Sequence, residues 1–143
     1  MLNFRMLVAA VVLVSAALLT AQARPGQGQE QERVQAISPP ATPLPPEAAS
    51  AGVTKYSFIA YGDTRGRRDG VAIQYEHSLI VDSMLAQIKK LQTTDYPVRF
   101  ILQSGDAVVH GQIAKEWNVS FVPLINRLTT EGGVPYFLAP GKS

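Results

Sequence analysis

The chain of 143 residues contains no cysteine, which excludes disulfides and any lipid attached through a cysteine. The chain also lacks a large excess of charge of either sign, since it has 13 Lys and Arg and 11 Asp and Glu. Because the sequence shows no sustained basic stripe, nucleic acid is not favoured as a partner. Two nucleotide-binding patterns are also missing. The sequence has no Gly-x-Gly-x-x-Gly, and a P-loop ending at "GKS" would need glycine where Tyr136 stands.

The N-terminus has the pattern of a targeting segment. Arg5 precedes an apolar run over 6–19, and Ala21-Gln22-Ala23 supplies the small residues at which signal peptidases cut. The run is shorter than the ~20 apolar residues that span a bilayer. The sequence therefore predicts a signal peptide over 1–23 and an exported protein, periplasmic or secreted, with no stable membrane span after its removal. An uncleaved signal that anchors the chain in the membrane is the alternative.

Residues 24–53 are rich in Pro, Gln, Ala and Gly and show no apolar period. A segment of this composition cannot bury enough surface to offset the entropy lost on ordering. We expect a linker there, extended or disordered. The remaining residues, 54–143, are expected to form one domain.

Apolar residues in this domain alternate between two periods. Short runs at 56–61, 98–102 and 134–138 predict strands, the first of them buried on both faces. Stripes spaced by three and four residues predict helices between the strands, one over 81–91 and one over 117–128 that is kinked or restarted at Pro123. His77 is expected on the surface of the first helix. This order predicts an α/β fold, a βαβαβ unit with a mostly parallel sheet.

Two of the predicted strands are followed at once by Gly-Asp. Asp63 lies in "GDTRG" and Asp106 in "SGDAVVHG". Loops beyond the carboxyl ends of parallel strands collect functional residues, so the two carboxylates are expected to converge. Two anions so close require a cation or a shared proton. Metal ions bridged by Asp oxygens would meet this need and would suit phosphate-ester chemistry. The other interpretation is that both aspartates only begin turns.

With these Gly-Asp pairs and the Pro-Gly that follows the third strand, residues 56–141 resemble the calcineurin-like metallophosphoesterases. The blocks of that family read Asp-x-His, Gly-Asp and Gly-Asn-His. The resemblance implies the N-terminal part of an αββα sandwich that hydrolyses phosphate esters with two divalent metal ions, of the Fe, Mn or Zn type. It also implies that Asp63 holds one metal and that Asp106 bridges both.

The sequence departs from the family at two places. Arg65 stands where the family has histidine, and we expect it to contact phosphate or to hold Asp106. Lys142 and Ser143 stand where Asn-His would follow, so the resemblance implies a chain truncated before that block. His110 is either a third metal ligand or a polar loop residue. A catalytically inactive secreted binding module, or pseudo-enzyme remnant, is the alternative function, and half of a periplasmic ligand-binding domain is a third.

Overall fold

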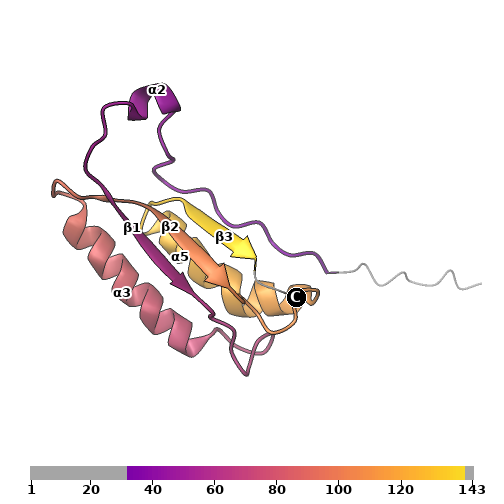
Figure 1. Cartoon of the computed structure of the whole chain (residues 1–143). Helices are drawn as coiled ribbons and strands as arrows, with labels where there is room; N and C mark the ends of the chain where they lie inside the picture. The colour runs from indigo at the N-terminus through magenta and orange to yellow at the C-terminus, as the bar shows by residue number, and fades with distance from the viewer. Residues whose placement is uncertain (1–31, 141–143) are drawn as a thin grey trace, which may run out of the picture. The chain divides into compact units, whose positions relative to one another are not determined.

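The computed structural model describes residues 32–140, and these form a three-stranded parallel sheet in the order β1-β2-β3 with helices between the strands (Figure 1). The elements in chain order are α2 (Glu47–Ser50), β1 (Ser57–Gly62), α3 (Tyr75–Leu91), β2 (Val98–Gly105), α4 (Ala114–Glu116), the π-helical turn η1 (Trp117–Phe121), α5 (Val122–Thr130) and β3 (Tyr136–Pro140). The predicted α/β class and the parallel sheet are confirmed. The predicted signal peptide, 1–23, lies outside the described residues. Among those described, no helix is long and apolar enough to cross a bilayer.

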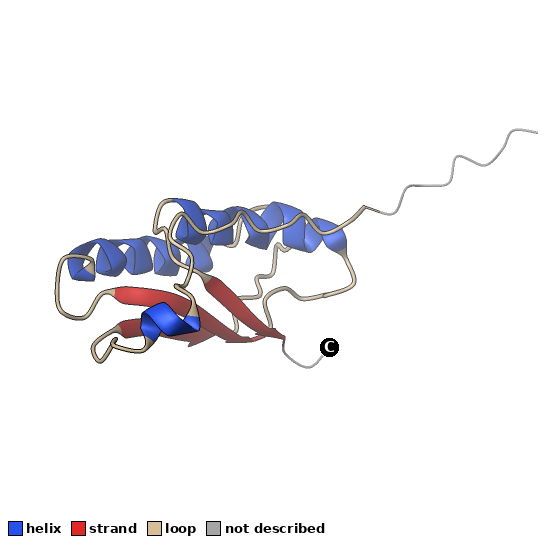
Figure 2. Ribbon diagram, turned by 90° about the horizontal axis from the view of Figure 1, so that it is seen from above, coloured by secondary structure: helices blue, strands red, loops and turns tan. Residues whose placement is uncertain are grey.

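The hydrophobic core lies between the sheet and its two long helices. Helices α3 and α5 lie on the same side of the sheet (Figure 2). Helix α3 contributes Val81, Met84 and Ile88, which recur every three or four residues and so share one face of the helix. They pack with Ile101 of β2 and Leu128 of α5. This packing fixes the sheet beneath the helices and sets where the strand ends lie.

The other face of the sheet is open within the described residues, which corrects the expectation for the first strand. Burial alternates along β1 instead of being continuous, and Phe58 is half exposed. On this open face Phe58 stacks on Phe100, with ring centroids 5.3 Å apart, and Phe100 meets Phe137 edge-on at 6.2 Å. An apolar run predicts a strand, but it does not show how many faces of the strand are covered by other elements. In the part of the chain that the structure describes, only one face is covered, because α3 and α5 lie on the same side of the sheet.

The second helical stripe is continuous but changes its winding at one place. The carbonyl of Trp117 accepts a hydrogen bond from the N–H of Val122, five residues later, and Pro123 occupies the first turn of α5. Proline has no N–H and its ring crowds the preceding turn, so the helix widens to a π turn before it continues. The predicted restart at Pro123 is confirmed.

The Pro- and Gln-rich segment, expected over 24–53 as an extended or disordered linker, packs on the domain where the structure describes it. From residue 32 it is extended up to the short helix α2, and it belongs to the same compact unit as the sheet. The backbone N–H of Gln35 donates to Asn118 Oδ1 at 2.8 Å, and that of Ser38 to Asn126 Oδ1 at 2.8 Å. Asparagine side chains on the helical layer thus take the place of strand pairing, which composition alone does not show.

We predict that Asn126→Leu loosens this segment and leaves the domain folded. Loss of one part-buried hydrogen bond lowers the free energy of unfolding by about 1 kcal/mol. Limited proteolysis of the full chain should then cut faster between residues 32 and 42, and urea unfolding measures the loss. Asn126→Asp is the matched control, because it keeps the accepting oxygen. Equal cleavage rates in all three proteins would show that the contact does not hold the segment.

Candidate functional site

The candidate site lies where β1 and β2 end side by side. The two strands are parallel, with Gly62 opposite Ser104. Beyond their ends the backbones stay joined, since the N–H of Asp63 donates to the carbonyl of Ser104 at 3.1 Å and that of Thr64 to the carbonyl of Asp106 at 2.9 Å. The two Gly-Asp loops therefore leave the sheet as a pair, as the sequence predicts.

Glycine is required at both strand ends. A Cβ at Gly62 would collide with the carbonyl oxygen of Ser104 on the neighbouring strand. Gly105 has φ of +86°, and a Cβ there would lie 3.2 Å from the backbone nitrogen of Asp63. Each glycine thus lies against the other loop, and Gly105 adopts a conformation that side chains disfavour. Asp63 itself has φ of +51°, which Asp tolerates better than most residues.

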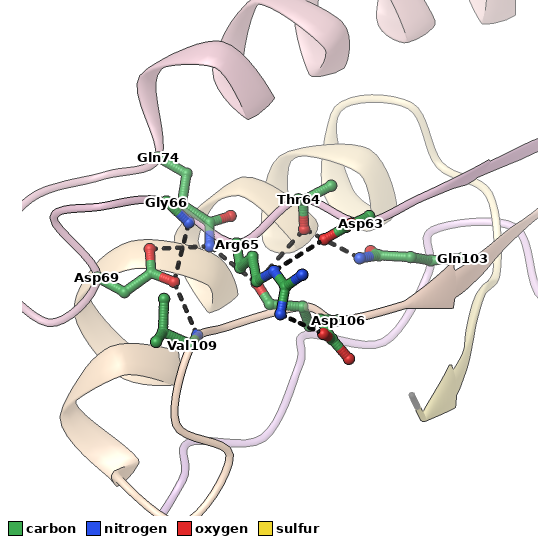
Figure 3. A network of polar contacts seen from close by, with 10 residues as sticks. Asp63, Thr64, Arg65, Gly66, Asp69, Gln74, Gln103, Asp106 and Val109 are labelled. Carbon is green, nitrogen blue, oxygen red and sulfur yellow. Dashed lines mark hydrogen bonds and ion pairs between the residues drawn. The ribbon is translucent and has the colours of Figure 1, made fainter. Parts of the chain in front are cut away.

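The guanidinium of Arg65 lies between the two aspartates (Figure 3). Its Nη1 is 2.6 Å from Asp106 Oδ2, and its Nε is 3.3 Å from Asp63 Oδ1. The Asp106 side chain is 28% exposed, whereas those of Asp63 and Arg65 are 63% and 50% exposed. Solvent screens such pairs, so their contribution to stability stays below about 1 kcal/mol. The cation that two converging carboxylates require is here the guanidinium of Arg65, which lies in the same loop as Asp63.

His110 is held by Glu116. Its Nδ1 lies 2.8 Å from Glu116 Oε1, and its backbone N–H donates to Glu116 Oε2 at 2.7 Å. The Glu116 side chain is buried, and it reaches the loop from α4. Among residues 32–140, no three His, Asp or Glu side chains gather as a metal site would require. The structure therefore brings Asp63 and Asp106 together and does not place His110 with them.

Asp69 fastens the two loops to each other, a role that the sequence does not indicate. Its Oδ2 accepts hydrogen bonds from the backbone N–H of Gly66 and of Val109, both at 3.1 Å. Its Oδ1 accepts from Gln74 Nε2 at 3.0 Å (Figure 3). One carboxylate therefore holds the loop after β1, the loop after β2 and the residue that precedes α3.

A buried chain of amide and hydroxyl groups supports the site from below. Gln74 Nε2 also donates to the carbonyl of Ala107 at 2.8 Å. Gln103 Nε2 donates to Thr64 Oγ1 at 3.0 Å, and Gln103 Oε1 accepts from the hydroxyl of Tyr136. Within the described residues, every buried side-chain nitrogen and oxygen has a partner. Buried polar groups that are all satisfied make the floor of the site rigid.

His77 belongs to this buried chain, which corrects its expected place on the surface. It is 1% exposed, with Nδ1 2.8 Å from Gln74 Oε1 and Nε2 3.1 Å from the hydroxyl of Tyr61. Burial lowers the pKa of His77 to about 4, so the ring is neutral at pH 7. Burial also raises the pKa of Tyr61 and of Tyr136 far above the usual tyrosine range. These three groups are structural and do not exchange protons near neutral pH.

Sequence signals exist for some of these residues. His77 precedes Val81 by four positions, which puts it on the same stripe of α3. Gln103 follows the apolar run of β2 within the same strand, and a polar residue that is buried in a strand needs a hydrogen-bonding partner. Asp69 carries no such signal, because the donor that links the two loops, Val109, is forty residues away.

The chain matches no known family model, and no curated protein is significantly similar to it in sequence. The function is therefore inferred from the residues of the site. They combine two converging carboxylates with a half-exposed guanidinium above a network of satisfied buried polar groups. Oxygen donors of this kind suit hard divalent cations, and a guanidinium suits an oxyanion.

We predict that His77 makes the domain sensitive to acid. Its pKa is about 4 when folded and near 6.5 when unfolded, so the unfolded chain takes up the proton first. Its stabilisation is full above pH 6.5 and is lost as pH falls toward 4. At pH 5 the loss from this group is about 2 kcal/mol. Urea unfolding at pH 7 and pH 5 measures it.

His77→Gln should remove this dependence, and His110→Gln, which changes an exposed histidine, should keep it. Both variants are compared with the original chain over the same pH interval. An unchanged pH dependence in His77→Gln would assign the acid sensitivity to other groups.

Proposed function

We propose that the described domain contributes to a metal-dependent phosphoesterase site and acts after export. The observation that carries this proposal is the pair of Gly-Asp strand ends that present Asp63 and Asp106 to one positive group, Arg65. Two carboxylates from adjacent parallel strands on one cation is the arrangement that a bridging metal site also needs. The resemblance to calcineurin-like metallophosphoesterases is consistent with it.

The two aspartates would hold divalent ions of the Fe, Mn or Zn type. One oxygen of each faces Arg65, and both side chains reach solvent, so ions have access to them. Bound ions would polarise the phosphate ester and lower the pKa of a water molecule. Asp63 and Asp106 fit such a site as two of its oxygen donors. His110, held by Glu116, does not complete it in the described arrangement.

Arg65 would have two positions. In the first position it pairs with the aspartates, with Nη1 2.6 Å from Asp106 Oδ2. When a divalent ion takes over that charge, the half-exposed guanidinium is free to turn to a phosphate oxygen, where its planar fork can bind two oxygens at once. The side chain would thus orient the substrate and would be displaced from the carboxylates by metal binding.

The open aromatic face supports the αββα sandwich as the architecture of the whole domain. Phe58, Phe100 and Phe137 form a continuous apolar strip on the face opposite α3 and α5. In a sandwich a second sheet would cover this strip. We propose that this face is the inner one.

A metal-free, catalytically inactive binding module is the second candidate. The Arg65 contacts favour it, because this guanidinium is a cation that pairs with both carboxylates. In that case Arg65 would release Asp106 and bind an anionic ligand in its place. Metal titration and hydrolysis assays separate the two candidates.

We predict that the full chain binds Mn²⁺ and Zn²⁺ through these aspartates. Calorimetric titration should show binding that falls by about tenfold or more in Asp106→Asn, because an amide replaces a charged ligand. Arg65→Gln should bind Mn²⁺ more tightly, since it removes a competing positive charge. Asp95→Asn is the matched control. Asp95 lies between α3 and β2, at the opposite end of the strands from the site, and pairs with Lys55.

Hydrolysis of p-nitrophenyl phosphate and its bis-ester is measured in the same proteins. Metal-dependent turnover that Asp106→Asn abolishes and Asp95→Asn retains would support the phosphoesterase. Metal binding without turnover would reject hydrolysis, and the absence of both metal binding and turnover would leave the metal-free binding module.

A further inference from the structure

A pocket of about 240 Å³ lies elsewhere on the domain, but a larger one of about 610 Å³ adjoins the candidate site. The larger pocket is formed by the loop after β1 and the start of α3, and Arg65 lines it. Its volume is in the range of pockets that hold small organic ligands. Arg65 contacts both aspartates and also lines the pocket, so a ligand bound at the aspartates would lie next to the pocket.

The lining of the pocket includes both basic and apolar side chains. Arg67 and Arg68 line it together with Arg65, and neither forms an ion pair within residues 32–140. Tyr75 and Ile73 add exposed apolar surface, with exposed fractions of 67% and 50%.

Two acidic residues, Asp69 and Glu76, also line the pocket. The oxygens of Asp69 accept the three N–H groups that hold the loops, so its charge is partly neutralised. Glu76 is exposed to solvent in the first turn of α3. Arg65 is paired with Asp106 and Asp63, so the positive charge left to the pocket is that of Arg67 and Arg68.

The loop that carries these arginines has a fixed shape, which distinguishes it from a solvated surface loop. The N–H of Gly70 donates to Ser120 Oγ at 2.8 Å, and that hydroxyl donates to the carbonyl of Ala72 at 2.6 Å. Gly70 is buried with φ of +80° against Glu116. Arg67 and Arg68 are thus presented from a backbone that is anchored on both sides.

We propose that this pocket binds a second anionic group of the substrate, so that the preferred ligands are diphosphate-type esters, in which a second phosphate neighbours the first. Arg65 would take one phosphate, and Arg67 with Arg68 the other. Tyr75 and Ile73 would contact the organic part. This inference rests on the proposed function, because it assumes that the aspartate site receives a phosphate ester.

Binding of inorganic pyrophosphate and of orthophosphate tests the pocket, by calorimetry on the full chain carrying Asp63→Asn and Asp106→Asn. EDTA is present so that metals play no part, and the two substitutions release Arg65, which otherwise pairs with both aspartates. The variants compared with it are made in this background. We expect pyrophosphate to bind about tenfold more tightly, since one extra charge-assisted contact is worth roughly that factor. The double variant Arg67→Gln/Arg68→Gln should lose this preference and still bind orthophosphate. Lys89→Gln/Arg99→Gln is the control, because it removes the same charge from exposed positions outside the pocket.

Equal affinity for the two anions, or an equal loss of preference in the control variant, would overturn the proposal. Thermal unfolding of both double variants shows that they are folded. The outcome is independent of the hydrolysis assay: a pyrophosphate preference without turnover would keep the pocket and reject the phosphoesterase, and turnover without the preference would do the reverse.

Discussion

The structure of the site depends on one electrostatic constraint. Two parallel strands end in aspartates whose carboxylates converge, and the repulsion between them must be balanced. The guanidinium of Arg65 does this, with contacts of 2.6 Å to Asp106 and 3.3 Å to Asp63. The two proposed functions differ in what happens to that guanidinium. In the enzyme a divalent ion would replace it at the carboxylates, whereas in the binding module no ion would do so.

The rest of the fold keeps these charged groups close. Gly62 and Gly105 let the strand ends approach. A Cβ at Gly62 would collide with the carbonyl oxygen of Ser104, and one at Gly105 would lie close to the backbone of Asp63. Asp69 then ties the loops together, and the buried amides of Gln74 and Gln103 hold the backbone beneath them. The site can therefore exchange the partner of its carboxylates without moving its backbone, as a preformed binding site should.

The sequence predicted the features that are local. The alternation of strands and helices along the chain, the restart at Pro123 and the pairing of two Gly-Asp ends follow from periodicity and from backbone chemistry. The errors concern tertiary contacts. An apolar run does not show that β1 is covered on one face only, and composition does not show that asparagines bind the segment after residue 32. The spacing of His77 from Val81 puts it on the buried stripe, which the sequence interpretation overlooked. The contact by which Asp69 joins the two loops is with Val109, forty residues away, so local sequence does not show it.

A double-mutant cycle on Arg65 and Asp106 tests the electrostatic constraint most directly. The free energy of unfolding of the full chain is measured in urea with EDTA for Arg65→Gln, Asp106→Asn and the double variant. If Arg65 balances the two carboxylates, removing Asp106 relieves part of the cost of losing Arg65. The cycle then gives a coupling of about 0.5–1 kcal/mol that shrinks in high salt. Additive effects at low salt would contradict the account.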